Sequence, residues 1–537
     1  MLPALCALAL LVSPAHSQTH TFDRLRSGAD AALTAYGSQP GPRIGDGVLH
    51  LLHGKTDQSN VVAFPRSAQG AHSRIEASFR LRCDEGADGA AFALLNTGVY
   101  GTHGAGPNVG KWEEPNLTRS FAVGFDIYNP PTENRFDENG NVYSRPQREV
   151  SVHWDGTEVA NALSPVEFRG GEFHDVHISI RHVIGGALVS VTIDDTDIYH
   201  DHFIAEMVPH ECRVALAGRT GGMTTRLAVD DLTVEYLDPI ASADRAARQR
   251  YQFFAREIVH AGNRTPVGEF QLAPPDLQVA RIILTLSLAA PPGDFDPWDR
   301  SAAIYAWGDD GERYEICRYI TPFGRGYTWK VDVTDYQSIL RGHRKMGLYI
   351  DTWVGGETHE TRQGWKVSVD LDYYPGTPER EAFSVTNLWS GQPEYGNPDH
   401  PMADWFAPRT GVIGADAKAA KLRFMVTGHG MSPSSKNAAE FMPAGRTVTV
   451  NETSYENTLW KTDVYLNPCR PQGGTWKFDR AGWAPGDIVT PWDIDITDAV
   501  APAKPCAITY TPAPYLNENR DKSRATHWVE AQIIQYR

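Results

Sequence analysis

The stretch SRIEASFRL at residues 73–81 alternates polar and apolar side chains with a period of two. That period is typical of a β-strand that buries one face and exposes the other. Comparable stretches recur at hairpin-like spacing from about residue 19 to residue 237, separated by Gly, Asp, Asn or Pro turns: 90–95, 121–128, 149–154, 174–180, 188–193, 213–217 and 225–236. Short strands at this spacing predict an antiparallel β-sandwich.

Strand-like stretches continue through the rest of the chain. They resume at Val267, run to about Tyr374, and are clearest beyond residue 380 at 421–427, 446–450 and 528–536. Two turn-rich segments, 237–244 and 374–380, indicate breaks between domains. Residues 245–259 have a mixed periodicity that does not decide between helix and strand. We therefore expect an all-β chain with domains at 19–238, 245–376 and 377–537, the last two being sandwiches side by side.

Composition limits the classes of partner. The chain has 537 residues, a formal net charge of −16 and 14 Trp, 21 Tyr and 20 Phe. Because no stretch is dominated by Lys and Arg, a nucleic-acid partner is not expected. An acidic protein rich in aromatic residues suits a neutral or polar ligand such as carbohydrate. The alternative is that the charge serves only to keep the protein soluble.

The first 17 residues have the features of a secretory signal, although a basic amino-terminal region is missing. Residues 5–12 are an apolar run, and Ala15-His16-Ser17 gives a small residue on each side of the histidine. The run is too short to span a bilayer, and no later stretch reaches about 18 apolar residues. The sequence therefore predicts a secreted or periplasmic protein that does not insert into a membrane.

Five cysteines remain after residue 17, and export permits disulfides. We expect the pairs Cys83–Cys212 and Cys469–Cys506, because each lies inside one proposed domain. The odd count leaves one thiol over. We expect Cys317, in a strand-like run, to be that free and buried thiol.

The first domain contains ADGAAFAL at 87–94, FAVGFDIYN at 121–129, VALAGRT at 214–220 and LAVDDL at 227–232. In this order the segments resemble concanavalin-A-like jelly rolls of the legume-lectin and laminin-G type. The resemblance implies a sugar site at Asp88 and Asn129, with Asp126 and Asn129 near a metal ion. Gly124 stands where legume lectins place a second metal-binding carboxylate, and calcium takes about six to eight oxygens. A spacing or docking domain without a ligand stays the alternative.

Asp296-Pro297-Trp298-Asp299-Arg300 follows a Pro-Pro-Gly turn, with strand-like runs on both sides. A carboxylate at a strand end, beside an aromatic face and a cation that could hold its charge, suits a catalytic group acting next to a sugar. Taken alone, the motif suits a surface ion pair equally well. The segments that follow it decide between the two.

Those segments are YEICRYITPF at 314–323, WKVDVTDYQSIL at 329–340, LYIDTW at 348–353, TGHG at 427–430, AAEF at 438–441 and FDRAGWAPGD at 478–487. Together with the motif at 296–300, this ordered set resembles the bacterial peptide-N-glycosidase F family over about residues 251–537. The resemblance implies two eight-stranded jelly rolls with an active site between them. It implies hydrolysis of the amide that joins an N-linked glycan to asparagine, in glycoproteins and glycopeptides, by a monomer without a metal or other cofactor.

The resemblance also implies roles for single residues. Asp299 matches the essential carboxylate, Glu440 a second acid, and Asp351 a third, supporting acid that is Glu in the best-known member. The residues expected to bind substrate or to brace the cleft are Trp298, Arg300, Trp353, His429, Arg480 and Trp483. The cysteines that flank the first two acids in the family are missing here, so packing must hold the site loops.

Two other functions remain open at this point. The same fold without activity would be a glycan-binding protein. His429 and Met431 at a two-residue spacing also resemble one copper motif of the peptide-amidating monooxygenases, but the further histidines that copper needs are not found. In the enzyme reading, the lectin-like domain would raise the local concentration of substrate.

Overall fold

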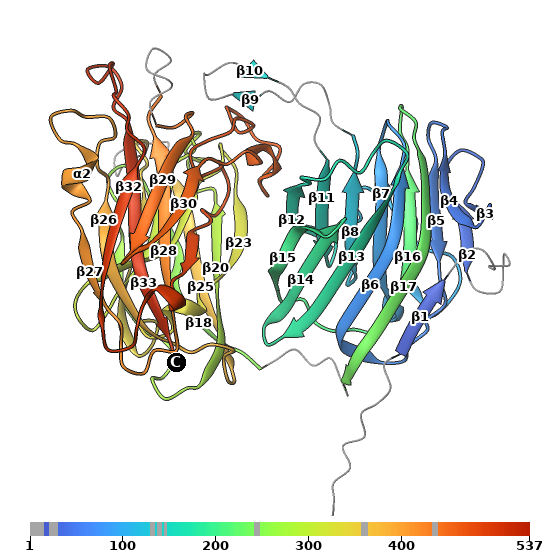
Figure 1. The fold of residues 1–537 in the computed structure, drawn as a ribbon, viewed down its shortest axis with the longest axis horizontal. Coiled ribbons are helices and arrows are strands. Elements are labelled where there is room, and N and C mark those ends of the chain that lie inside the picture. The colour runs from blue at the N-terminus through green and yellow to red at the C-terminus, as the bar shows by residue number, and fades with distance from the viewer. Residues whose placement is uncertain are drawn as a thin grey trace, which may run out of the picture. The chain divides into compact units, whose positions relative to one another are not determined.

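The computed structural model describes residues 16–20, 31–128, 135–136, 142–143, 148–240, 247–355, 363–431 and 439–537. Their regular secondary structure is almost entirely antiparallel strand, which confirms the predicted all-β class. The chain divides into two compact units, Met1–Pro130 with Pro146–Arg245 and Pro131–Arg145 with Ala246–Arg537 (Figure 1). Among the described residues, no helix is long and apolar enough to cross a membrane.

The first unit is a sandwich of two antiparallel sheets. One sheet has the order β15-β14-β13-β6-β17-β4-β3, with β1 also paired to β17, and the other has the order β12-β11-β8-β7-β16-β5-β2. The strands of the first sheet are β1 (His16–His20), β3 (Arg43–Gly45), β4 (Val48–His53), β6 (Ala71–Cys83), β13 (Phe173–Val183), β14 (Gly186–Ile193), β15 (Thr196–Ala205) and β17 (Arg226–Ile240). Those of the second are β2 (Ala32–Ala35), β5 (Ser59–Ala63), β7 (Gly89–Asn96), β8 (Phe121–Asp126), β11 (Glu149–Trp154), β12 (Thr157–Leu163) and β16 (Cys212–Arg219).

The alternation seen in the sequence explains how this sandwich closes. In β6, the residues Ile75, Ala77, Phe79 and Leu81 all point into one hydrophobic core, as the stretch at 73–81 predicts. Strand β7 is buried along its whole length because the segment that follows it, with the short helix α1 (Thr97–Tyr100) and the buried Trp112, covers the outer face.

The second unit contains four antiparallel sheets of four strands each, arranged as two sandwiches (Figure 1). The first sandwich has the sheets β18-β25-β20-β23 and β19-β24-β21-β22, and the second has β26-β33-β28-β31 and β27-β32-β29-β30. The first is built from β18 (Gln249–Val259), β19 (Val267–Gln271), β20 (Val279–Ala289), β21 (Ser301–Trp307), β22 (Arg313–Ile320), β23 (Tyr327–Asp332), η1 (Thr334–Tyr336), β24 (His343–Ile350) and β25 (Trp365–Pro375).

The second sandwich is built from β26 (Ala382–Gly391), α2 (Met402–Trp405), β27 (Arg409–Val412), β28 (Ala419–His429), β29 (Ala444–Val450), β30 (Thr453–Leu459), η3 (Val464–Leu466), β31 (Trp492–Asp495), η4 (Thr497–Ala499), β32 (Pro505–Pro512) and β33 (Thr526–Tyr536). The pair β9 (Arg135–Phe136) and β10 (Val142–Tyr143) forms a separate two-stranded sheet.

Polar side chains join the two sandwiches of the second unit. Arg318 of β22 is fully buried and donates hydrogen bonds to the carbonyl oxygens of Met425 and Trp528, at 3.2 and 2.6 Å. Its charge is balanced by Glu315, whose carboxylate accepts from Nε at 2.6 Å. Because a buried charge is costly without a partner, this pair fixes where β22 meets β28 and β33.

Strand β18 occupies the segment whose periodicity was mixed. Its pairing with β25 shifts register twice, between Gln252 and Phe254 and between Phe254 and Glu257, and Arg256 has a φ of 60°. Each bulge inserts an extra residue, so Phe253 and Phe254 are both buried although they are neighbours. The strict period of two is therefore lost from the sequence.

The expected linker at 237–244 is partly wrong, because β17 continues to Ile240 and its last residues pair with His72 and Ala71 of β6. Residues 241–246 lie outside the described residues. So do residues 1–15, which carry most of the expected signal, while Ser17 at its end lies in β1.

Both expected disulfides are wrong, since all five of these cysteines are free and buried, as was expected of Cys317 alone. Cys212 interacts with Tyr236, which pairs with Ile75 of β6. Cys83 lies eight residues further along that strand, a span of roughly 26 Å, whereas a disulfide needs Cα atoms within about 7 Å. Cys469 and Cys506 belong to the cores of different sandwiches.

Candidate active site

The loop before β21 is held by a buried carboxylate. Asp296 has no exposed surface. It accepts hydrogen bonds from Nε of Arg300 at 2.6 Å, from the hydroxyl of Thr352 at 2.7 Å and from the backbone N–H of Trp298 at 3.1 Å. Three charge-assisted contacts to one buried group make a strong anchor. In place of a disulfide, this carboxylate fastens the loop.

This arrangement changes the role of Arg300. The described hydrogen bonds of its guanidinium go to Asp296, at 2.6 and 3.2 Å, rather than to its neighbour Asp299. Arg300 therefore supports the loop directly, and it favours the charged form of Asp299 only as a nearby charge.

Arg480 is the cation at Asp299. Its Nη2 lies 3.7 Å from Oδ2 of Asp299, and its Nε lies 3.4 Å from Oε1 of Glu440. The guanidinium is fully buried, while the two carboxylates are 16% and 19% exposed. One cation thus brings together two acids that lie 141 residues apart in the sequence and that belong to different sandwiches of the second unit.

Arg480 is fixed by its own loop. Nη1 donates to the carbonyl oxygens of Thr475 and Phe478, each at 2.8 Å, and Nη2 donates to the hydroxyl of Thr475 at 2.6 Å. The guanidinium also lies 4.9 Å from the ring centre of Phe441. Since the contact to Asp299 is longer than a hydrogen bond, that carboxylate keeps lone pairs for water or substrate.

The backbone around Glu440 is equally constrained. Its N–H donates to the carbonyl of Gly430 at 3.1 Å, and its carbonyl accepts from Ala481 at 2.9 Å. Gly428 completes this packing, because a Cβ there would lie 2.4 Å from the carbonyl oxygen of Ala439 and 2.7 Å from Cβ of Ala481. The glycine of the TGHG segment therefore lets the strand approach the Glu440 loop.

The electrostatics of the two acids follow from this burial. Burial raises the pKa of Asp299 to about 7, with Arg480 opposing the shift and Glu440 adding to it. Burial also raises the pKa of Glu440, against the pull of Arg480. A site with one cation and two acids favours a state in which one acid is charged and the other holds a proton.

His429 and Trp483 stack on each other beside Arg480, the cation between the two acids. Trp483 is 3% exposed, and its indole N–H donates to the carbonyl of Gly428 at 2.8 Å. The indole stacks on His429 at 5.3 Å between ring centres. Burial, followed by the nearby Arg318, lowers the pKa of His429 to about 3, so its imidazole is neutral near pH 7. Both side chains brace the site, and Trp483 has no free face for a sugar.

Asp351 and two indoles form the open side. The N–H of Asp351 donates to the carbonyl of Ser301 at 2.9 Å, beside the loop of Asp299. Its carboxylate lies 3.4 Å from Nη1 of Arg264, whose guanidinium lies 4.9 Å from the ring centre of Trp353. Trp353 and Trp298 are 65% and 56% exposed, so both offer a free aromatic face. Among the described contacts, none joins Asp351 to Asp299 or Glu440.

In the first unit, Asp88 is also paired with an arginine. Its Oδ2 lies 3.0 Å from Nη1 of Arg219, which also donates to Oε1 of the buried Glu113 at 2.5 Å. Burial raises the pKa of Asp88. This half-buried carboxylate can accept hydrogen bonds from a ligand, as the lectin resemblance implies.

The expected metal position near Asp126 has few neighbours of the right kind. Asp126 accepts from the N–H of Tyr128 at 2.7 Å, and Asn129 lies outside the described residues. A Cβ at Gly124 would lie 2.2 Å from the carbonyl oxygen of Glu113, so a second carboxylate does not fit there. The described residues contain no group of three His, Cys, Asp or Glu that could hold a metal ion, at Asp126 or at His429.

A family match covers most of the carboxyl-terminal sandwich. Residues 408–534 match the sequence model described as "Peptide-N-glycosidase F, C terminal", and this range contains His429, Glu440, Arg480 and Trp483. Residues 408–534 are thus similar to the carboxyl-terminal domain of peptide-N-glycosidase F. The resemblance found in the sequence is thereby confirmed.

Two relatives of peptide-N-glycosidase F type are similar to a longer part of the chain. Peptide-N(4)-(N-acetyl-beta-D-glucosaminyl)asparagine amidase F of Elizabethkingia miricola is 29% identical over 215 residues, which are 37% of this chain and 58% of the relative. The chain thus matches less than two thirds of that relative's length. The solved structure of PNGase F from Flavobacterium meningosepticum aligns with 54% of this chain and 96% of its own, at 23% identity and a TM-score of 0.49.

The first unit also has similar solved structures. The metal-free exoplasmic/lumenal domain of VIP36 aligns with 42% of this chain and 93% of its own, at 14% identity and a TM-score of 0.30.

Sequence reasoning missed three residues that support the site, two of which lie inside the quoted motifs at 296–300 and 348–353. Asp296, Thr352 and Arg264 were not assigned a role, although Asp296 lies four residues before Arg300. That spacing inside a Pro-containing turn is the signal that could have indicated their ion pair. No such signal exists for Arg264, because its partner Asp351 is 87 residues away.

Proposed function

We propose that the second unit is a peptide-N-glycosidase that hydrolyses the amide between an N-linked glycan and asparagine. The observation that carries the proposal is the sharing of buried Arg480 between Asp299 and Glu440. The match of residues 408–534 to the peptide-N-glycosidase F C-terminal model supports it. The motifs at 296–300 and 348–353 supply the remaining acid and the exposed indoles.

The reaction needs an activated water, a stabilised carbonyl oxygen and a proton for the leaving nitrogen. Water adds to the amide carbon, the bond from carbon to nitrogen breaks, and the nitrogen leaves with the glycan as a glycosylamine. Asparagine becomes aspartate. A carboxylate that holds the water and a carboxylic acid that supplies the proton fit this balance, and a pKa of about 7 lets Asp299 exchange a proton near neutral pH.

We assign Asp299 the central position, facing the first sugar and the water, and Glu440 the amide side. Trp298 and Trp353 offer exposed indoles on which the apolar face of a sugar ring can pack. Arg480, His429 and Trp483 keep the two acids in place. Asp351 has a supporting role through Arg264 and Trp353.

We also propose that the chain is exported, acts as a monomer, and uses the first unit to bind carbohydrate at Asp88. Such a unit would hold the enzyme near glycoproteins and raise the local substrate concentration. The cluster of Asp88, Arg219 and Glu113 supports this role, because a carboxylate acceptor and a guanidinium donor lie together at a half-buried position.

The experiment that tests the proposal uses the full chain and a denatured N-glycoprotein. Peptide mass spectrometry should show aspartate at the former glycosylation site, and the complete glycan should be found in solution. A single sugar left on asparagine would identify a glycosidase that cuts between the core sugars. Intact glycopeptides after long incubation would instead support a glycan-binding protein.

A further inference from the structure

A pocket of about 390 Å³ opens between the two sandwiches of the second unit. Strands β19, β21, β22 and β24 line it from the first sandwich, and β26 and β33 line it from the second. Four aromatic side chains form much of its wall: Tyr305, Trp307, Tyr349 and Trp528. We call it the outer pocket, because the site at Asp299 lies at the other end of β21.

Two residues that line the outer pocket adjoin the open side of the candidate active site. Tyr349 of β24 lines the pocket, and its hydroxyl interacts with Asp351, the residue that follows the end of β24. Thr265 lines the pocket as well, and it follows Arg264, which pairs with Asp351 and covers Trp353. A ligand that lies over Trp353 can therefore extend into the pocket without leaving the protein surface.

The charge of the pocket is opposite to that of the chain. Its lining includes Arg313 but no Asp or Glu, although the net charge of the chain is −16. The guanidinium of Arg313 lies 4.3 Å from the ring centre of Tyr305 and is exposed. No carboxylate among the described residues forms an ion pair with it. The ammonium of Lys345 lies nearby, 4.6 Å from the ring centre of Trp307.

The other lining groups suit hydroxyls and a sugar ring. Ser390, Gln392 and Thr265 provide neutral donors and acceptors. Trp307 packs on Gly347, where a Cβ would lie 3.1 Å from the indole. A pocket with aromatic walls, a few polar groups and one unpaired arginine is suited to a small anion rich in hydroxyl groups.

We propose that the outer pocket binds a carboxylate-bearing sugar at the outer end of the glycan whose first sugar lies at Asp299. This inference rests on the proposed function. Ser301 and Trp307 are six residues apart on β21, a span of roughly 20 Å. Arg313 pairs with Trp307 in the sheet. The guanidinium is thus too far away to contact the first sugar and is placed to receive a distal one.

The test uses two glycopeptides with the same peptide and the same branched glycan, with and without terminal N-acetylneuraminic acid. The wild-type enzyme should have the higher kcat/KM on the acidic glycopeptide, by about 10-fold. The variant Arg313→Gln should lose this preference, mainly through KM, and keep its kcat/KM on the neutral glycopeptide. Salt should weaken the wild-type preference.

Arg409→Gln is the matched control, because Arg409 is exposed on β27 of the second sandwich and lines no part of the pocket. This variant should keep the preference. Equal rates of the wild type on both glycopeptides, or an equal loss on both in Arg313→Gln, would overturn the proposal. A third glycopeptide, with an added aspartate and a neutral glycan, tests whether the pocket binds an acidic peptide instead. A higher kcat/KM on that substrate that depends on Arg313 would also overturn the proposal.

Binding measurements separate this proposal from the proposed function. If the neutral glycopeptide is not cleaved, the proposed activity fails, and titration with 3′-sialyllactose against lactose still tests the pocket. Tighter binding of 3′-sialyllactose that is lost in Arg313→Gln but kept in Arg409→Gln would support the pocket by itself. Equal binding of 3′-sialyllactose and lactose by the wild type would reject the proposed pocket.

Discussion

At the scale of single residues, the pairing of Arg480 with two acids is the feature that sets the chemistry. One buried guanidinium contacts Asp299 and Glu440 at 3.7 and 3.4 Å. Because a single positive charge cannot fully offset two buried negative ones, burial raises the pKa of both acids. The fold therefore favours a protonated carboxyl group in a place where the proposed amide hydrolysis needs a proton donor.

Replacement of Asp299 by asparagine should separate activity from stability. Loss of the proton-exchanging carboxylate should lower kcat by about 100-fold or more. Burial raises the pKa of Asp299 to about 7 from an ordinary 3.8, so the fold of the wild type loses stability as the pH rises through this window. Asp299→Asn removes that loss. Thermal unfolding should therefore show that the variant is more stable than the wild type above pH 7, by on the order of 2 kcal/mol. Near pH 4 the two proteins should not differ in this way.

The control for this change is Asp294→Asn in the same loop. Asp294 is exposed and has a φ of 89°, a conformation that asparagine also adopts. It should leave kcat and both unfolding curves unchanged. Full activity in a folded Asp299→Asn protein would remove Asp299 from the catalytic role.

At the scale of elements, the anchoring of the loop before β21 could be foreseen only in part. The motifs indicated Asp299 and its position at a strand end, and the absence of cysteines indicated that packing must hold the loop. The pairing of Asp296 with Arg300 and Thr352 was not predicted, because it depends on where β24 ends beside β21. Strand alternation was predicted well in β6, and it failed in β18, where two bulges break it.

Loss of the Asp296 carboxylate should loosen this loop without removing a group from the reaction. Asp296→Ala leaves Arg300 and Thr352 without their acceptor, which should cost about 3 kcal/mol of stability. Arg300→Gln should reproduce a smaller version of the same effect. Hydrogen exchange should increase in residues 290–300, and kcat should fall in both variants.

The distinguishing observation is the response of KM in Arg300→Gln. If Arg300 acts through the loop, kcat falls as exchange in residues 290–300 rises. A higher KM with an unchanged kcat and an unchanged exchange rate would show instead that Arg300 binds the substrate directly.

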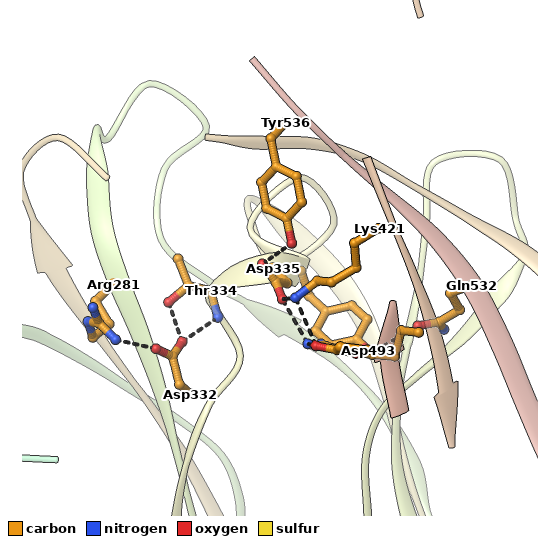
Figure 2. A network of polar contacts seen from close by, with 10 residues as sticks. Arg281, Asp332, Thr334, Asp335, Lys421, Asp493, Gln532 and Tyr536 are labelled. Atoms are coloured by element: carbon orange, nitrogen blue, oxygen red, sulfur yellow. Dashed lines mark hydrogen bonds and ion pairs between the residues drawn. The ribbon is translucent and has the colours of Figure 1, made fainter. Parts of the chain in front are cut away.

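At the scale of the whole molecule, a second set of charges joins the two sandwiches of the second unit. Figure 2 shows Asp335 of η1 with Lys421 of β28, Asp493 of β31 and Tyr536 of β33 around it. Asp335 accepts from Nζ of Lys421 at 2.7 Å and from the hydroxyl of Tyr536 at 2.8 Å. Arg423 donates to the same carboxylate at 2.9 Å. The first sandwich thus supplies an acid to two cations of the second.

Asp335→Asn should therefore destabilise the second unit and leave the first unchanged. Burial would raise the pKa of Asp335, but Arg423 and Lys421 outweigh it and lower the pKa to about 2 from an ordinary 3.8. The stabilisation is present above pH 4 and is lost as the pH falls toward 2, and it amounts to about 2 kcal/mol at neutral pH. Because the chain forms two compact units, calorimetry at pH 7 should show a lower Tm for one transition only.

Asp332→Asn is the control, since the partners of Asp332 in Figure 2, Arg281 and Thr334, belong to its own sandwich. Equal losses in the two variants would show that Asp335 does not join the sandwiches.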